Sequence, residues 1–219
     1  IQLMRTRNIG YVLPFILLSL LHILAIEGGE ELLRVATKPF LIPALAWAYY
    51  RVTPNFYKLV LLALFFSFLG DVFLLGEGSL FFLAGLGSFL ITNVLYSALL
   101  MKLQSWCPRA VLLSTLIFGT YAVGFMTLLY PTLDTFLYPV LGYALVICFF
   151  GMLAFHAFYT QPSQGLVILL GATLFILSDS LIAINTFYVD YTYFSTSIMV
   201  TYLLAQALIV YYFSQEVVS

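Results

Sequence analysis

"LYPVLGYALVICFFGMLAFHAF", residues 137–158, contains no Asp, Glu, Lys or Arg over 22 positions. A transmembrane helix needs about 20 consecutive apolar residues to cross the hydrocarbon core of a bilayer. The rest of the chain has the same character, because 63% of its 219 residues are hydrophobic, only 8% are charged, and its mean hydropathy is +1.09. Soluble domains have roughly 45–50% apolar and about 25% charged residues. The sequence therefore predicts a polytopic membrane protein.

Breaks at proline, glycine and charged residues divide the chain into eight predicted spans. The spans are residues 9–27, 38–50, 56–75, 80–102, 109–129, 137–158, 164–184 and 193–213. The second is short, so we expect Pro39 and Pro43 to bend it or its helix to begin before Lys38. We predict an all-α fold, a bundle of eight transmembrane helices forming one integral membrane domain over residues 1–219.

The distribution of Lys and Arg predicts the orientation. The side that carries the N-terminus has six basic residues, Arg5, Arg7, Arg51, Lys58, Lys102 and Arg109. The opposite side has two basic residues, Arg34 and Lys38, and most of the acids, Glu27, Glu30, Glu31, Glu77, Asp134 and Asp190. We expect a cytoplasmic N-terminus and, after eight spans, a cytoplasmic C-terminus. The first span has no small-residue cleavage site, so we expect no cleavable signal peptide.

Composition also limits the kinds of ligand. The net charge of −1 offers no basic surface for nucleic acid. Cys107 is predicted at a membrane boundary and Cys148 near mid-bilayer, farther apart than the roughly 7 Å Cα separation that a disulfide allows. Cysteine and histidine spacing shows no zinc pattern, and we expect His22 and His156 to be packing residues. We predict no metal site and no cofactor.

Two aspartates stand inside predicted spans. Asp71 lies in "FFSFLGDVFLLGEG" (65–78) and Asp179 in "LFILSDSLIAIN" (174–185). A carboxylate at such depth costs a few kcal/mol and marks a functional site by default. Each aspartate lies about five residues beyond the middle of its span, roughly 8 Å above the midplane in the leaflet opposite the N-terminal side. We predict that the two carboxylates share one cavity, whereas the alternative makes each a structural hydrogen-bond acceptor.

Two carboxylates in one apolar pocket do not ionise together, so one stays charged while the other holds a proton. That pairing is the one required for general acid–base catalysis. The segments around them also match weakly, "FLGDVFLL" (68–75) with "ILSDSLIA" (176–183), at an offset of 108 residues. Two explanations stay open, duplication of a four-helix half and chance similarity between apolar helices.

Other polar residues of the predicted spans are candidates for binding a substrate. Lys38 lies on the same side as the aspartates, where its ammonium can pair with a carboxylate, bind a phosphate or extend to the headgroups. The remaining candidates are Asn93, Tyr96, Asn185, Tyr202 and Gln206. For each of these five the alternative is a hydrogen bond that holds helices together.

Five motifs in order resemble one known family. They are "TKPFLIPAL" (37–45), "SFLGDVFLL" (67–75), "FFLAGLGSFLITNVLY" (81–96), "GATLFILSDSLIAIN" (171–185) and "YLLAQALI" (202–209). Together they resemble the lysoplasmalogenase family of YhhN-type membrane proteins, over roughly residues 30–213. The resemblance implies an eight-span ether hydrolase that cleaves the vinyl ether bond of lysoplasmalogens. The expected products are a fatty aldehyde and glycerophosphoethanolamine or glycerophosphocholine.

The resemblance also implies residue roles. The family's Lys-Pro, Gly-Asp and Ser-Asp pairs correspond to Lys38 and Pro39, Gly70 and Asp71, and Ser178 and Asp179. The histidine usual in the fourth span is Asn93 here, which can hydrogen-bond but cannot shuttle a proton. We expect Asp71 and Asp179 to be catalytic and Lys38 to hold the phosphate of a lysophospholipid substrate.

Two other classes of function remain as alternatives. Intramembrane carboxylates and repeated halves are also typical of proton-coupled transporters, in which case helix breaks are expected at Gly70 or Gly171. A lipid-binding or scaffolding protein without turnover is the third class. Release of aldehyde by the purified protein in detergent distinguishes the enzyme from both.

Overall fold

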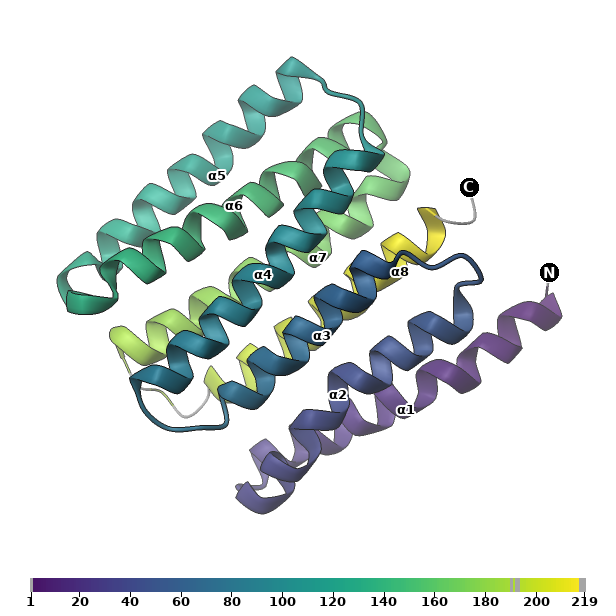
Figure 1. The fold of residues 1–219 in the computed structure, drawn as a ribbon, viewed down its shortest axis with the longest axis horizontal. Coiled ribbons are helices and arrows are strands. Elements are labelled where there is room, and N and C mark those ends of the chain that lie inside the picture. The colour runs from purple at the N-terminus through teal and green to yellow at the C-terminus, as the bar shows by residue number, and fades with distance from the viewer. Residues whose placement is uncertain (1, 190, 192–193, 217–219) are drawn as a thin grey trace. The chain divides into compact units, whose positions relative to one another are not determined.

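The computed structural model describes the backbone of residues 2–189, 191 and 194–216, and the side chains of residues 10–189, 191 and 194–215. Its helices are α1 (Gln2–Glu27), α2 (Glu31–Val52), α3 (Lys58–Phe73), α4 (Ser79–Leu103), α5 (Pro108–Leu129), η1 (Tyr130–Thr132), η2 (Asp134–Phe136), α6 (Leu137–Thr160), α7 (Pro162–Phe187) and α8 (Phe194–Glu216) (Figure 1). The described residues form no strand. The all-α prediction is confirmed for them. The side chains of Arg5 and Arg7, and all of Asp190, lie outside the described residues.

Six of these described helices, α1 and α4 to α8, are long and apolar enough to cross a membrane. The chain is an integral, multi-pass membrane protein. Helix α3 has 16 residues, about 24 Å at 1.5 Å per residue, against a hydrocarbon core about 30 Å thick. Helix α2 is long enough, but Arg34, Lys38 and Arg51 lower its hydropathy. Membrane crossing by α2 and α3, and with it the count of eight spans, stays a prediction.

Helix α2 begins seven residues before Lys38 and includes both Pro39 and Pro43. This confirms the expectation that the second helix extends beyond its short apolar segment. The described chain divides into two compact units, residues 1–92 with 213–219, and residues 93–212. The boundary falls inside α4, whereas two four-helix halves would meet in the loop after α4. A duplication of halves stays a prediction.

In the first unit, α1 and α2 form a hairpin that closes on two glycines, and α2 also packs against α3. The Gly29 N–H donates to the Ile26 carbonyl at 3.1 Å, and the Glu30 N–H donates to the Ala25 carbonyl at 2.9 Å. This pair of bonds is the Schellman motif, which needs a left-handed residue after the helix. Gly29 supplies it with φ of 69°, a value that costs glycine little.

In the second unit, α6 packs against both α5 and α7 (Figure 1). The α6–α7 hairpin closes tightly, because a Cβ at Gly165 would lie 2.4 Å from the Ala157 backbone. Gly171 similarly faces the backbone of α8, with the Ala205 carbonyl 3.3 Å from the position of a Cβ. Both glycines therefore serve close helix packing, as small residues do in membrane bundles.

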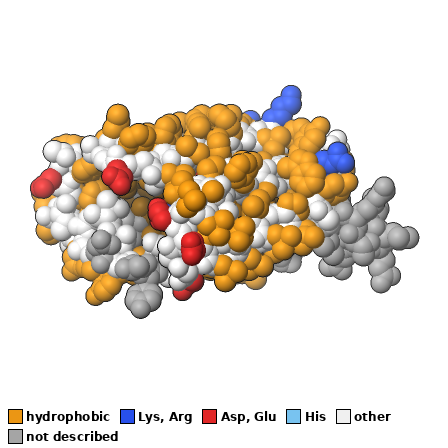
Figure 2. All heavy atoms as spheres, turned by 90° about the horizontal axis from the view of Figure 1, so that it is seen from below, with side chains coloured by type: hydrophobic (Ala, Val, Ile, Leu, Met, Phe, Trp, Pro, Cys, Tyr) orange, Lys and Arg blue, Asp and Glu red, His pale blue; other side chains and the backbone are white. Residues whose placement is uncertain are grey.

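Hydrophobic side chains cover most of the face drawn in Figure 2, and few charged side chains interrupt them. Many large apolar residues of the spanning helices are exposed, among them Leu24, Leu116, Val123, Leu145 and Leu177. An aqueous surface would make such exposure costly, whereas lipid chains are as apolar as leucine. The exposed surface therefore agrees with a lipid environment.

Candidate functional site

Asp71 lies in the last turn of α3 and is only 3% exposed. The ammonium of Lys38, on the neighbouring helix α2, interacts electrostatically with its carboxylate. Lys38 is itself only 8% exposed. A buried charge is expensive unless an opposite charge accompanies it. The first unit thus holds two opposite charges that compensate each other.

This placement bears on the three expectations for Lys38. A lysine that extends to the headgroups keeps its ammonium at the surface, but this side chain is buried. Pairing with a carboxylate agrees with the structure, since Asp71 is its charged neighbour of opposite sign. Phosphate binding by Lys38 stays a prediction.

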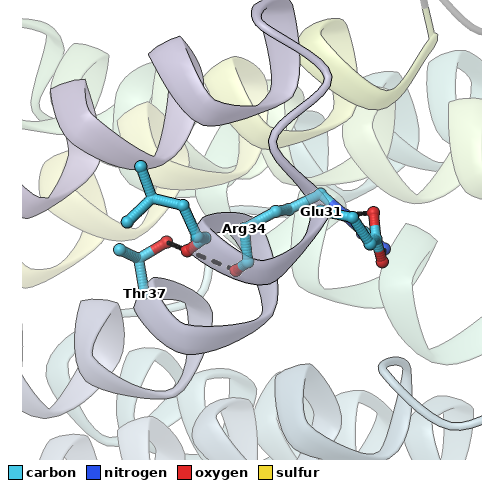
Figure 3. A network of polar contacts seen from close by, with 4 residues as sticks. Glu31, Arg34 and Thr37 are labelled. Carbon is cyan, nitrogen blue, oxygen red and sulfur yellow. Dashed lines mark hydrogen bonds and ion pairs between the residues drawn. The ribbon is translucent and has the colours of Figure 1, made fainter.

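His22, on α1, joins the same region. Its Nδ1 lies 2.8 Å from Oγ1 of Thr37, the residue before Lys38. The Thr37 hydroxyl donates its own proton to the Leu33 carbonyl at 2.7 Å (Figure 3). The imidazole N–H is therefore the donor to Thr37. His22 also interacts electrostatically with Lys38. It is buried and hydrogen-bonded, as expected of a packing histidine, but it also lies near the charged pair.

Arg34 forms an ion pair with Glu31 one turn away on α2 (Figure 3). Its Nε donates to Oε2 of Glu31 at 2.8 Å and its Nη2 donates to Oε1 at 2.5 Å. The hydrogen bond from Arg34 holds the pKa of Glu31 below its usual value. Because Glu31 is exposed, solvent screens this pair and its effect on stability is small. The acid thereby occupies the Nε donor and one Nη2 donor of Arg34.

Two hydrogen-bonded hydroxyl groups join α3 to α4 at the turn of α3 that precedes Asp71. The hydroxyls of Ser67 on α3 and Thr92 on α4 are 3.2 Å apart, and the Thr92 hydroxyl reaches the Ala63 carbonyl at 3.1 Å. Both side chains are fully buried. Neither residue was predicted from the sequence. The spacing of Ser67 and Asp71, four residues on one helix, was the available signal, because such residues share a face.

Asp179 is partly buried on α7 and lies in the second unit. The Tyr143 hydroxyl on α6 donates to its Oδ2. The amide Nδ2 of Asn93 on α4 donates in turn to the Tyr143 oxygen at 3.4 Å. Three helices therefore contribute to one polar chain that ends on the carboxylate.

Two more groups lie near this carboxylate. The Tyr121 hydroxyl on α5 hydrogen-bonds Ser180, the next residue on α7, and interacts electrostatically with Asp179. Neither tyrosine was identified from the sequence. Tyr143 lies about four residues from the middle of its predicted span, toward the same leaflet as Asp179. Its depth in the span, the signal that singled out the aspartates, was therefore also available for Tyr143.

The other predicted binding residues divide into two groups. The Tyr96 hydroxyl donates to Oε1 of Gln206 at 2.9 Å, which joins α4 to α8 in the interior of the second unit. Tyr202 packs edge-on against Phe175 of α7. Asn185 instead accepts the backbone N–H of Tyr191 at 3.0 Å and so binds this residue to the end of α7. Substrate contact by any of the four stays a prediction.

His156 has a clear structural role. Its Nε2 accepts the backbone N–H of Cys107 at 2.9 Å, and its Nδ1 lies 2.9 Å from Oε1 of Gln104. The ring is therefore neutral, with its proton on Nδ1 and directed at Gln104. These bonds fasten the loop between α4 and α5 to helix α6. Cys107 and Cys148 are both free thiols.

Each compact unit thus contains one predicted catalytic aspartate with its own partners. Asp71 has a cationic neighbour in the first unit, and Asp179 receives a phenol hydrogen bond in the second. The expectation that the two carboxylates share one cavity stays a prediction. Chemically, these groups offer proton donation and stabilisation of a cation.

The fold defines a polytopic α-helical membrane protein with a carboxyl group inside each of two helices, Asp71 in α3 and Asp179 in α7. The model of the YhhN family matches residues 33–212, and the chain belongs to this family. This confirms the resemblance found in the sequence.

Two relatives carry more specific names. Human "Lysoplasmalogenase TMEM86A" is 32% identical over 160 residues, which is 68% of this chain and 62% of that protein. The protein of the same name from Bos taurus matches with the same values. The match therefore covers less than two thirds of the length of these relatives. No solved structure matches the chain.

Proposed function

We propose that this protein hydrolyses the vinyl ether bond of lysoplasmalogens within the membrane, giving a fatty aldehyde and a glycerophospho-alcohol. The observation that carries the proposal is Asp179, a carboxyl group in a membrane helix that receives a phenol hydrogen bond. The names of the two relatives support the same substrate class. Intramembrane carboxyl groups are costly, and function is the usual reason for keeping them.

The reaction begins with a proton transfer from a carboxylic acid to the alkenyl carbon remote from oxygen. The C=C bond becomes a single bond and an oxocarbenium ion forms. Water adds to the carbon attached to oxygen and loses a proton to a carboxylate. The resulting hemiacetal breaks its bond to the glycerol oxygen, and that oxygen takes up the proton released by the hemiacetal hydroxyl group. One water is consumed, and the enzyme regains its starting proton count.

We assign the acid to Asp179 and the cation-stabilising carboxylate to Asp71. The groups described beside Asp179 include two neutral phenols, which favour the ionised form of a carboxyl group less strongly than an adjacent cation does. Asp71 instead has the Lys38 ammonium as neighbour, and an adjacent cation favours the ionised form of a carboxylate. Pairs of carboxyl groups in different environments perform the same two tasks in glycosidases, whose transition states are also oxocarbenium-like.

The test is mass spectrometry of products after incubation of the purified protein with lysolipids. Lysoplasmalogens should yield fatty aldehyde, whereas matched ester and alkyl ether lysolipids should not, because neither has an alkene carbon to protonate. Asp71→Asn and Asp179→Asn should each lower turnover by roughly 100-fold or more. Near-native aldehyde release by both variants would refute the scheme, and absence of release by the folded wild-type protein would refute the proposed function.

The transporter alternative receives less support. It predicts helix breaks at Gly70 or Gly171 near the carboxylates. Gly70 lies inside continuous helix α3, and Gly171 lies inside continuous helix α7. The Cβ position of Gly70 is occupied by the Phe89 ring at 2.7 Å, so this glycine serves packing. Hydrolysis is therefore the function that the described residues support best.

A further inference from the structure

The hydrogen-bond chain that ends on Asp179 has a defined direction. Asn93, on α4, contributes Nδ2, which lies 3.4 Å from the Tyr143 oxygen. An amide nitrogen can only donate, so the phenol oxygen accepts this bond. The single phenol proton is then available for one acceptor, which is Oδ2 of Asp179. Asn93 is fully buried and Tyr143 is buried, so water does not compete readily for these bonds.

This direction decides which oxygen of Asp179 can carry a transferable proton. An oxygen that accepts a hydrogen bond from Tyr143 acts as the carbonyl oxygen when the carboxyl group is protonated. The acid proton then belongs to the other oxygen, Oδ1. A protonated carboxyl group has one donor, and its orientation determines where that proton can be delivered.

We infer that Tyr143 is a positioning residue, which reserves Oδ2 of Asp179 as an acceptor and so places the acid proton on Oδ1. Asn93 acts one step further away, because it fixes the direction of the phenol proton. The inference rests on the proposed function for its kinetic consequence, but the hydrogen-bond chain itself does not. It assigns to Asn93 a role through Tyr143 in place of the predicted contact with substrate.

Steady-state kinetics of four variants test the hydrogen-bond chain that runs from Asn93 through Tyr143 to Asp179. Tyr143→Phe should lower kcat by roughly 10–100-fold with little change in KM, because orientation of the acid matters in the transition state. Asn93→Leu should lower kcat less in the wild-type background and not at all in the Tyr143→Phe background. Tyr49→Phe is the matched control, since it removes another buried phenol whose oxygen accepts the Tyr57 N–H in the first unit. Its kcat should equal that of the wild type.

Two kinetic outcomes would overturn the inference. One is an unchanged kcat for Tyr143→Phe. The other is an equal effect of Asn93→Leu in both backgrounds accompanied by a raised KM, which would mean that Asn93 contacts the substrate directly. If Tyr143→Phe does not fold, Asn93→Leu alone is sufficient for the test. A lower kcat then supports the positioning role, and a raised KM contradicts it.

A second readout does not depend on turnover. An apolar carbodiimide modifies protonated carboxyl groups in membranes, and mass spectrometry of peptides locates the adduct. The titratable groups described near Asp179 are Tyr143 on α6 and Tyr121 on α5. Loss of the phenol donor favours the protonated form, so Tyr143→Phe should move the midpoint of Asp179 labelling to higher pH.

The two readouts separate the inference from the proposed function. A shifted labelling midpoint in a protein that releases no aldehyde would refute the hydrolase and retain the positioning role of Tyr143. Aldehyde release with an unshifted midpoint, or with no labelling of Asp179 at any pH, would refute the positioning role and retain the hydrolase.

Discussion

Lys38 and Asp71 in the first unit show how apolar helices tolerate ionisable residues. Lys38 and Asp71 are both buried, and each reduces the cost of the other. Removing one partner of a buried pair leaves an uncompensated charge, which is worse than removing both. The effects of the two substitutions on the free energy of unfolding should therefore be coupled, and two single variants and the double variant can measure this coupling.

We expect Lys38→Met and Asp71→Asn each to lower the free energy of unfolding, the former by about 3–5 kcal/mol because it leaves a charged carboxylate unpaired. The double variant should lose less than the sum of the two single losses. Thermal unfolding in detergent measures all three. Losses that add would show that the two side chains act independently.

The imidazole of His156 has a structural role, because it hydrogen-bonds Cys107 and Gln104. We expect His156→Phe to lower the free energy of unfolding by about 1–3 kcal/mol, because two part-buried hydrogen bonds are lost, from the Cys107 N–H and to the Gln104 side chain. The kcat for lysoplasmalogen should not change. A large fall in kcat without loss of stability would instead assign His156 to the chemistry.

At the scale of the helices, most contacts were not predictable from pattern. The spanning helices are apolar on nearly all sides, as in a membrane interior, so no polar stripe reveals which face meets a neighbour. The glycines are a partial exception. Gly165 lies where α6 and α7 come closest, and a small residue is needed for backbones to approach.

We expect Gly165→Ala to destabilise the α6–α7 hairpin, because its Cβ would lie 2.4 Å from backbone atoms of Ala157 and Phe158. Backbone atoms cannot move aside as a flexible side chain can. Gly142→Ala is the matched control on α6, since nothing lies within 4 Å of its Cβ position, and alanine favours a helix by about 1 kcal/mol over glycine. Thermal unfolding should show a clear loss for the first variant and none for the second.

For the whole molecule, the side on which the loop after α2 lies depends on whether α2 and α3 cross the membrane. Every crossing changes the side on which the next loop lies. With eight crossings, the loop at Asn55 lies on the same side as Cys107. If α2 and α3 instead stay outside the membrane on the side where α1 ends, Asn55 lies opposite Cys107.

Labelling with a membrane-impermeant maleimide in sealed vesicles of known orientation distinguishes these topologies. We expect Asn55→Cys, in a Cys107→Ser background, to react from the cytoplasmic side, as we also expect of native Cys107. Glu77→Cys in the same background is the control and should react from the other side in both topologies. Cys148 is buried and should stay unlabelled. Reaction of Asn55→Cys from the side of Glu77→Cys would reduce the count to six spans.

The sequence alone determined the class of the fold, the positions of the helices and the two residues whose burial demands an explanation. Length and hydropathy of a segment are local properties, and the cost of an intramembrane carboxylate follows from its place in such a segment. Only the tertiary structure decided that Lys38 accompanies Asp71 and that Tyr143 and Asn93 serve Asp179. Those partners depend on how each helix is rotated about its own axis, and a helix that is apolar all round does not record that rotation in its sequence.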